Sequence, residues 1–129
     1  MKIAVNGTSG FIGGELCRFF RDQGHEVVAI PRAAYTDKDA LKNFIGGCDA
    51  VINLAGASIA ARWSEDYKKQ LRTSRIETTR TLVSAINELE NPPFFISASA
   101  VGIYENGLSH DESSVKFDRG FLGELACEW

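Results

Sequence analysis

The sequence has no surplus of positive charge and few of the residues that build metal sites. It contains 14 Lys and Arg residues against 17 Asp and Glu, which gives a formal net charge of −3 at pH 7. Electrostatic binding of nucleic acid or of an anionic membrane surface needs a basic patch. We therefore expect neither as a partner. The two histidines, His25 and His110, have no ligand-type residue at a useful spacing, so no metal site is predicted.

Cysteines and long apolar runs are also scarce. Cys17, Cys48 and Cys127 are odd in number and far apart, which indicates reduced thiols rather than a disulfide framework. No stretch approaches the roughly 20 apolar residues of a membrane-spanning helix, and the first apolar run is too short for a signal peptide. These absences predict a cytoplasmic protein. The helical ending "FLGELACEW" has no cap, which predicts a truncated chain.

Short apolar runs alternate with amphipathic helical patterns along the chain. Strands are expected at 2–6, 25–30, 49–56 and 94–99. Helices are expected over 11–23 and 37–45, over one long segment that Ser64 caps and that ends near Leu89, and from about Asp118, after a loop over 105–119. This alternation predicts an α/β fold, a Rossmann-like doubly wound parallel sheet with flanking helices, in one domain over 1–129.

Three glycines follow the first strand at intervals of three residues. Gly7, Gly10 and Gly13 lie where that strand ends and the first helix begins. A helix N-terminus offers free N–H groups to a pyrophosphate, and absent side chains let the phosphate approach the backbone. The loop, with Thr8, Phe11 and Ile12, is therefore a candidate dinucleotide site. The alternative is a glycine-rich turn that serves only packing.

The end of the second expected strand bears on which dinucleotide is bound. NAD-selective sites carry a carboxylate about 20 residues after the glycines, where it contacts the ribose hydroxyls. Here the chain instead reads Ile30-Pro31-Arg32. A guanidinium can bind a 2′-phosphate, so we expect NADP rather than NAD. The alternative for Arg32 is a solvated loop arginine.

Four segments together resemble the extended short-chain dehydrogenase/reductase superfamily, and within it the nucleoside-diphosphate-sugar epimerase-like branch. They are "NGTSGFIGGELCRFFRDQGHEVVAIPR", "DAVINLAGASIAARW", "SRIETTRTLVSAI" and "ISASAVGIY". The resemblance implies that Leu54, Ala55 and Gly56 lie against the cofactor. It also implies that Ser99 is the catalytic serine that hydrogen-bonds the substrate. Ser97 stays open as an alternative, because strand alternation puts it on the same face.

The sequence departs from this superfamily at its proton-transfer group. The superfamily uses a Tyr-x-x-x-Lys pair, but the corresponding region reads "RGFLGELACEW". The helical Asn of the superfamily is replaced by Arg75. An anionic substrate could be met by Arg62, Trp63, Lys68 and Arg75, although a solvated helix face is the alternative for Lys68 and Arg75. Tyr104 is a further candidate for binding the substrate, with a packing residue at the pocket wall as its alternative.

The function expected from these features is that of an NADP-dependent oxidoreductase or epimerase-like protein. Its substrate would be a small molecule, a sugar nucleotide or a similar hydroxyl or carbonyl compound, and this chain would be the cofactor-binding portion. We expect that portion alone to be inactive. The alternatives are a non-catalytic NADP-binding regulatory module and a protein-interaction factor.

Overall fold

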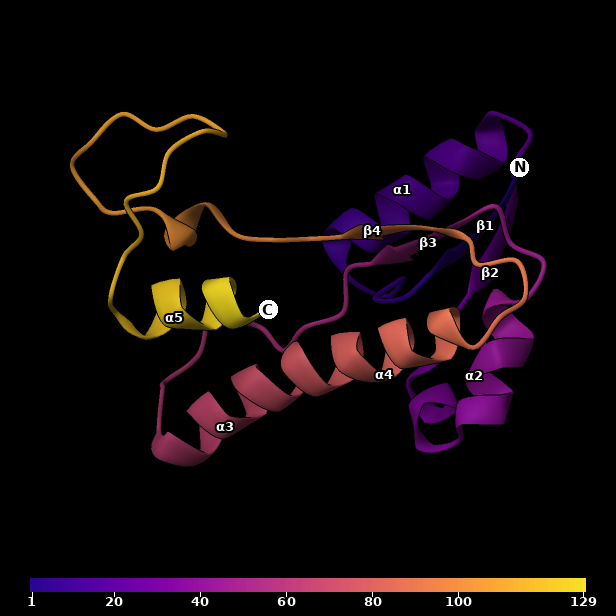
Figure 1. Ribbon diagram of the computed structural model, residues 1–129, viewed down its shortest axis with the longest axis horizontal. Coiled ribbons are helices and arrows are strands. Elements are labelled where there is room, and N and C mark those ends of the chain that lie inside the picture. Colours follow the sequence, from indigo (N-terminus) through magenta and orange to yellow (C-terminus); the bar gives the residue numbers. More distant parts are fainter. The chain divides into compact units, whose positions relative to one another are not determined.

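Four parallel strands form the sheet at the centre of residues 1–98 in the computed structural model, which describes all residues from 1 to 129 (Figure 1). The strands pair in the order β2-β1-β3-β4. Their bounds are β1 Lys2–Val5, β2 Glu26–Ala29, β3 Ala50–Asn53 and β4 Phe94–Ser97. The predicted parallel α/β fold is confirmed, and each strand is shorter than the sequence suggested.

Helices cover both faces of this sheet, as alternation along the strands requires. Ile3 and Val5 of β1 pack with helix α1 (Phe11–Asp22) in one apolar cluster. Ala4, which points the opposite way, belongs to a second cluster with α2 (Lys38–Ile45) and α4 (Ile76–Asn87). All residues of β3 are buried, and three of its four are apolar, as expected for a strand that is covered on both faces. The edge strand β4 is less covered, since Phe94 and Ile96 are exposed.

The chain reverses its direction across the sheet between β1 and β3. From β1 it passes through α1 to β2 on one side, and from β2 it passes through α2 to β3 on the other side of β1. In open α/β sheets, ligands bind beyond the carboxyl ends of the strands at such a point. The segments that follow β1, β2 and β3 are therefore the place to look for a site.

The single long helix expected after Ser64 is wrong, because the chain forms two helices there. Ser64 caps α3 (Glu65–Thr73) as predicted, since its Oγ accepts a hydrogen bond of 3.2 Å from the Tyr67 N–H. The helix then breaks at Ser74, whose Oγ donates to the carbonyl of Leu71 at 3.1 Å. Serine hydroxyls that bond back to the preceding turn compete with the helical pattern. The next N–H, of Arg75, accordingly donates to Arg72 O three residues back, at 3.0 Å.

Residues 99–129 form a second compact unit. It contains the 3-10 helix η2 (Val101–Ile103), an isolated antiparallel bridge between Tyr104 and Phe117, and helix α5 (Phe121–Glu128). The expected loop over 105–119 contains no helix, whereas the last helix begins three residues later than expected. Asp118 lies before it and accepts a hydrogen bond of 2.8 Å from the Gly120 N–H. That residues 1–129 make one cofactor-binding domain stays a prediction.

None of the helices has the length and apolar character needed to cross a membrane. All three cysteines are free thiols, with Cys17 and Cys48 buried and Cys127 exposed.

Candidate functional site

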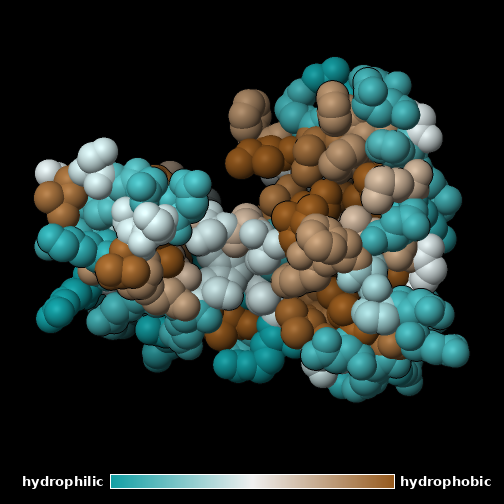
Figure 2. All heavy atoms as spheres, turned by 45° about the horizontal axis from the view of Figure 1, so that its top comes forward, coloured by the Kyte–Doolittle hydropathy of each residue, from teal (hydrophilic) through white to brown (hydrophobic).

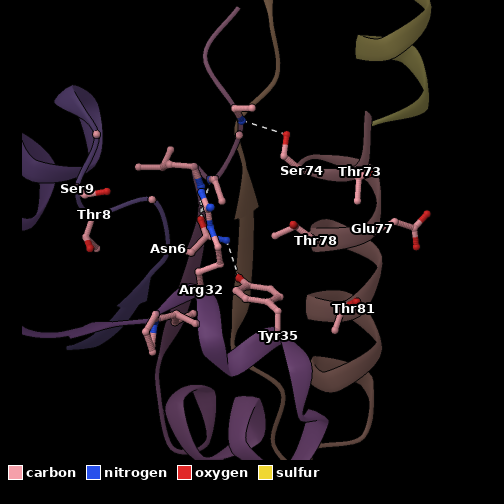
Figure 3. A pocket seen from close by; sticks show the side chains of 18 of the residues that line it. Asn6, Thr8, Ser9, Arg32, Tyr35, Thr73, Ser74, Glu77, Thr78 and Thr81 are labelled. Atoms are coloured by element: carbon pink, nitrogen blue, oxygen red, sulfur yellow. Dashed lines mark hydrogen bonds between the residues drawn. The ribbon is translucent and has the colours of Figure 1, made fainter. Parts of the chain in front are cut away.

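A cavity of about 590 Å³ opens beyond the carboxyl ends of the strands, where the chain reverses direction (Figure 3). Its wall is formed by the segments that follow β1, β2 and β3 and by one side of α3 and α4. The volume lies within the range of small-molecule and cofactor sites. The lining residues are Asn6–Gly10, Ile30–Arg32, Tyr35, Leu54–Ala57, Gln70, Thr73, Ser74, Glu77, Thr78 and Thr81.

Two of the three predicted glycines occupy positions that no other residue can fill without rearrangement. Gly7 has φ of +67°, and a Cβ there would lie 2.9 Å from the carbonyl carbon of Leu54. A Cβ on Gly13 would overlap the carbonyl oxygen of Gly7 and lie 2.8 Å from its carbon. Between them, the Gly10 N–H donates to Gly7 O at 3.0 Å and closes the turn. The backbone atoms of the turn therefore pack so closely that Gly7 and Gly13 leave no room for side chains.

The amides that open α1 point from this turn without side-chain partners. Gly10 is the N-cap and makes no side-chain cap, and the first helical bond runs from Gly14 N to Gly10 O at 2.8 Å. The preceding amides, of Phe11, Ile12 and Gly13, are thus the free donors of a helix N-terminus. The first turn carries no acidic side chain. Such an end attracts an anion.

The side chains of Phe11 and Ile12 lie outside the cavity, although both were predicted as cofactor residues. They are 89% and 66% exposed and line a separate groove on α1 with Phe19. Figure 2 shows hydrophobic side chains, in brown, gathered at the surface of the chain. Any contact that Phe11 and Ile12 make with a phosphate would come from their backbone amides.

A buried asparagine in the cavity wall, Asn6, connects the ends of β1 and β3 to the 3-10 helix η1 (Arg32–Thr36). Its Oδ1 accepts hydrogen bonds from the Leu54 N–H at 2.6 Å and the Ala55 N–H at 2.9 Å. Its Nδ2 donates to Asn53 Oδ1 at 2.6 Å and to the Tyr35 hydroxyl at 2.7 Å. Asn6 therefore fixes the position of the segment that follows β3.

Asn53 extends this network toward β4. Its Nδ2 donates to Thr79 Oγ1 at 2.8 Å and to Ser97 Oγ at 3.0 Å. No buried side-chain nitrogen or oxygen lacks a partner. Sequence reasoning missed Asn6 and Tyr35 as site residues. The sequence does contain a signal for Asn6: two short apolar runs, "IAV" and "AVI", are each followed by an asparagine.

Tyr35 gives this network a pH dependence. Burial raises the pKa of Tyr35, and the hydrogen bond from Asn6 opposes that rise. A tyrosine in the unfolded chain ionises near pH 10. The folded chain keeps the proton at a pH where the unfolded chain loses it, so this contribution is complete below about pH 10 and is lost as the pH rises further. We expect the free energy of unfolding to fall as the pH rises above about 10, and to fall less in Tyr35→Phe. Urea unfolding of both proteins measures this, and equal slopes would contradict it.

Arg32 is the one cation among the lining residues, and Glu77 is the one carboxylate. Arg32 is exposed at the start of η1 (Arg32–Thr36), directly after the segment that leaves β2. Glu77 is bound by Arg80 at 2.6 Å, and Figure 3 shows it directed away from Tyr35. No acidic side chain of the wall therefore opposes an anion beside Arg32.

The other predicted site residues do not line this cavity. Trp63 donates from Nε1 to Ile59 O at 2.9 Å, and Arg75 donates to Leu71 O and Ala57 O. Ser99 and Tyr104 belong to the second unit, in which Tyr104 stacks on His110 with ring centres 4.9 Å apart. Their expected roles with substrate stay predictions.

Comparison with known proteins gives consistent relatives. Residues 3–119 match the model of the NAD dependent epimerase/dehydratase family. Epimerase family protein SDR39U1 of Bos taurus is 34% identical over all of this chain and 47% of its own length. Epimerase family protein YfhF of Bacillus subtilis is 35% identical over all of this chain and 48% of its own.

A solved structure is similar over the whole chain. The crystal structure of human epimerase family protein SDR39U1 (isoform 2) with NADPH has a TM-score of 0.87 and 32% identity, and it covers all of this chain and 47% of that one. The likeness confirms the Rossmann-like fold. The chain spans about half the length of the curated relatives that it matches.

Proposed function

Since the chain belongs to the NAD dependent epimerase/dehydratase family, we propose that residues 1–98 hold the NADP of an oxidoreductase or epimerase. Its substrate is a sugar nucleotide or a similar hydroxyl or carbonyl compound. The observation that carries the proposal is the glycine turn, whose residues Gly7–Gly10 line the cavity and lead directly into the uncapped amides of α1. Support also comes from the human relative, whose structure was solved with NADPH.

The residues present fit a dinucleotide at three places. The amides of Phe11, Ile12 and Gly13 bind the diphosphate, and the turn that presents them closes only without a Cβ at Gly7 and Gly13. The backbone of Leu54–Gly56 lies against the cofactor. Arg32 binds the 2′-phosphate, because a guanidinium forms paired hydrogen bonds with phosphate oxygens. When bound, the nicotinamide supplies hydride transfer at a substrate carbon.

Exchange of Arg32 for alanine tests the choice of NADP. We expect the affinity for NADPH to fall about 10- to 100-fold, the range for a hydrogen bond to a charged group. The affinity for NADH, which has no 2′-phosphate, should not change. Nicotinamide fluorescence titration measures both constants.

Arg21→Ala is the matched control, since Arg21 is an exposed arginine in the last turn of α1 and does not line the cavity. It should leave both constants unchanged. Equal losses of NADPH and NADH affinity in Arg32→Ala would contradict the proposed phosphate contact.

The chemical step depends on Ser99, which we propose as the hydrogen-bond donor to the substrate oxygen. Ser97 is the alternative. It is the last residue of β4, and the hydrogen bond that its Oγ accepts from Asn53 holds it at that end of the strand. Trp63 and Tyr104 remain candidate residues for binding the substrate. We expect residues 1–129 to bind NADPH without turning over sugar nucleotides, and substrate-dependent loss of nicotinamide absorbance with this chain would contradict that.

A non-catalytic NADP-binding module is the second candidate function. It is favoured by the segment "RGFLGELACEW", which has neither the Tyr nor the Lys of the superfamily pair. Without that pair, a proton at the substrate oxygen needs another donor. A longer relative that binds NADPH and acts on none of a broad panel of sugar nucleotides would favour this candidate.

A further inference from the structure

The segment Leu54–Ala57 forms one wall of the cavity and is held at both ends. At its start, the N–H groups of Leu54 and Ala55 donate to Asn6 Oδ1. At its end, the Ala57 N–H donates to Ser74 Oγ at 3.0 Å, and Figure 3 shows this bond reaching from the wall to the helix. The position of the wall thus depends on the junction between α3 and α4.

Arg75 completes the attachment at that junction. Its Nη2 donates to Ala57 O at 3.0 Å and its Nη1 to Leu71 O at 3.3 Å. One guanidinium therefore connects the wall of the cavity to the last turn of α3. Both polar backbone groups of Ala57 are bound by adjacent residues, Ser74 and Arg75.

Gly56 provides the surface on which this guanidinium lies. A Cβ at Gly56 would meet Arg75 Cζ at 2.9 Å and Nη2 at 3.0 Å. The backbone of Gly56 does not have a positive φ, so its conformation suits alanine. A side chain at Gly56 would therefore displace the guanidinium from its present position, whereas the turn itself could accept one. Gly56 and Ala57 line the cavity, whereas Arg75, which contacts them, does not.

We propose that Arg75 is a positioning residue, which holds the Leu54–Ala57 wall in the shape that receives the cofactor. This inference rests on the proposed function and goes beyond it, because it assigns Arg75 to the cofactor wall in place of the substrate contact expected from the sequence. A planar guanidinium suits the role, since its two terminal nitrogens reach two separate carbonyls from one rigid plane, whereas all donors of an ammonium group lie on a single nitrogen.

Four variants and one control test the proposal on the full chain. They are Arg75→Ala, Arg75→Lys, Gly56→Ala, the double variant of Gly56→Ala with Arg75→Ala, and Lys69→Ala. Lys69 is the matched control, because it is an exposed cation of α3 with an ion pair to Asp66. Circular dichroism selects a temperature at which every variant is folded. Two quantities are then measured: the NADPH dissociation constant and the hydrogen-exchange rates of the Leu54 and Ala57 amides.

We expect Arg75→Ala to weaken NADPH binding about tenfold and to speed exchange at Ala57, with little change at Leu54. Arg75→Lys should fall between Arg75→Ala and the unchanged chain, and Lys69→Ala should change nothing. Gly56→Ala should weaken binding when Arg75 is present and add little when Arg75 is absent, because its Cβ then has room.

Additive effects of the two substitutions, or an unchanged NADPH constant in Arg75→Ala, would overturn the proposal. If Arg75→Ala does not fold, Arg75→Lys decides, and unchanged binding together with unchanged Ala57 exchange would overturn the proposal. If the unchanged chain binds no NADPH, the proposed function fails. The attachment itself is then judged by Ala57 exchange, where no difference between Arg75→Ala and Lys69→Ala would overturn it.

Discussion

Replacement of Gly13 by alanine is expected to weaken NADPH binding strongly and to destabilise the fold. The added Cβ would overlap the carbonyl oxygen of Gly7, a backbone atom that can move only if the whole turn moves. Overpacking against a fixed neighbour costs about 1–3 kcal/mol of unfolding free energy. A displaced turn no longer presents its amides, so we expect a loss of affinity on the order of 100-fold or more, equivalent to about 2.7 kcal/mol. Fluorescence titration and urea unfolding measure the two effects.

Gly14→Ala is the matched control for this variant. Gly14 is the next residue of α1, and a Cβ there would lie 3.6 Å from Thr8 O, an ordinary contact. Alanine is the better helix former by about 1 kcal/mol, so this variant should bind NADPH as before and be slightly more stable. Similar NADPH affinities for the two variants would show that the turn does not receive the diphosphate.

Removal of the Asn6 side chain should have the largest effect on stability. Asn6→Ala leaves four groups without their partner, the N–H groups of Leu54 and Ala55, Asn53 Oδ1 and the Tyr35 hydroxyl. An unsatisfied buried polar group costs about 1–3 kcal/mol, and partial relaxation makes a total of about 3–5 kcal/mol reasonable. Urea unfolding should show this loss, together with weaker NADPH binding.

Two further variants test the origin of that loss. Asn43→Ala removes an exposed asparagine of α2 and should change stability by a few tenths of a kcal/mol. Asn6→Asp keeps the oxygen that binds the Leu54 and Ala55 amides, but sets its second oxygen against Asn53 Oδ1, so it should remain destabilised near neutral pH. Full stability in Asn6→Asp would contradict the assigned orientation of the two amides.

The sheet and the glycine turn could be predicted because their signals are local. The runs "IAV" and "AVI" are apolar and continuous, as expected of strands that are buried on both faces. The glycines at 7, 10 and 13 stand where the apolar run stops, and the backbone geometry of Gly7 and Gly13 explains their presence. Ser64 was likewise identified as a cap from residue type and position.

The attachment of the α3–α4 junction to the cavity wall and the asparagine network depend on contacts between distant segments. Ser74 and Arg75 fit a continuous amphipathic pattern in the sequence, and their bonds to Ala57, from a different part of the chain, become apparent only in the structure. Asn6 reads as the last residue of a strand until the register places Asn53 beside it. In the sequence, Arg75 is a candidate substrate contact or a solvated surface charge, because its bond to Ala57 joins segments that are far apart along the chain.

The central claim is that the amides opening α1 bind the diphosphate of NADPH. The most direct test is to follow the backbone amide resonances of residues 1–129 by NMR while NADPH is added. We predict that the largest shifts fall on Gly10, Phe11, Ile12 and Gly13, with further shifts along Leu54–Ala57, and that Gly13→Ala removes them. An unchanged spectrum at 10–13, with or without shifts elsewhere, would contradict the claim.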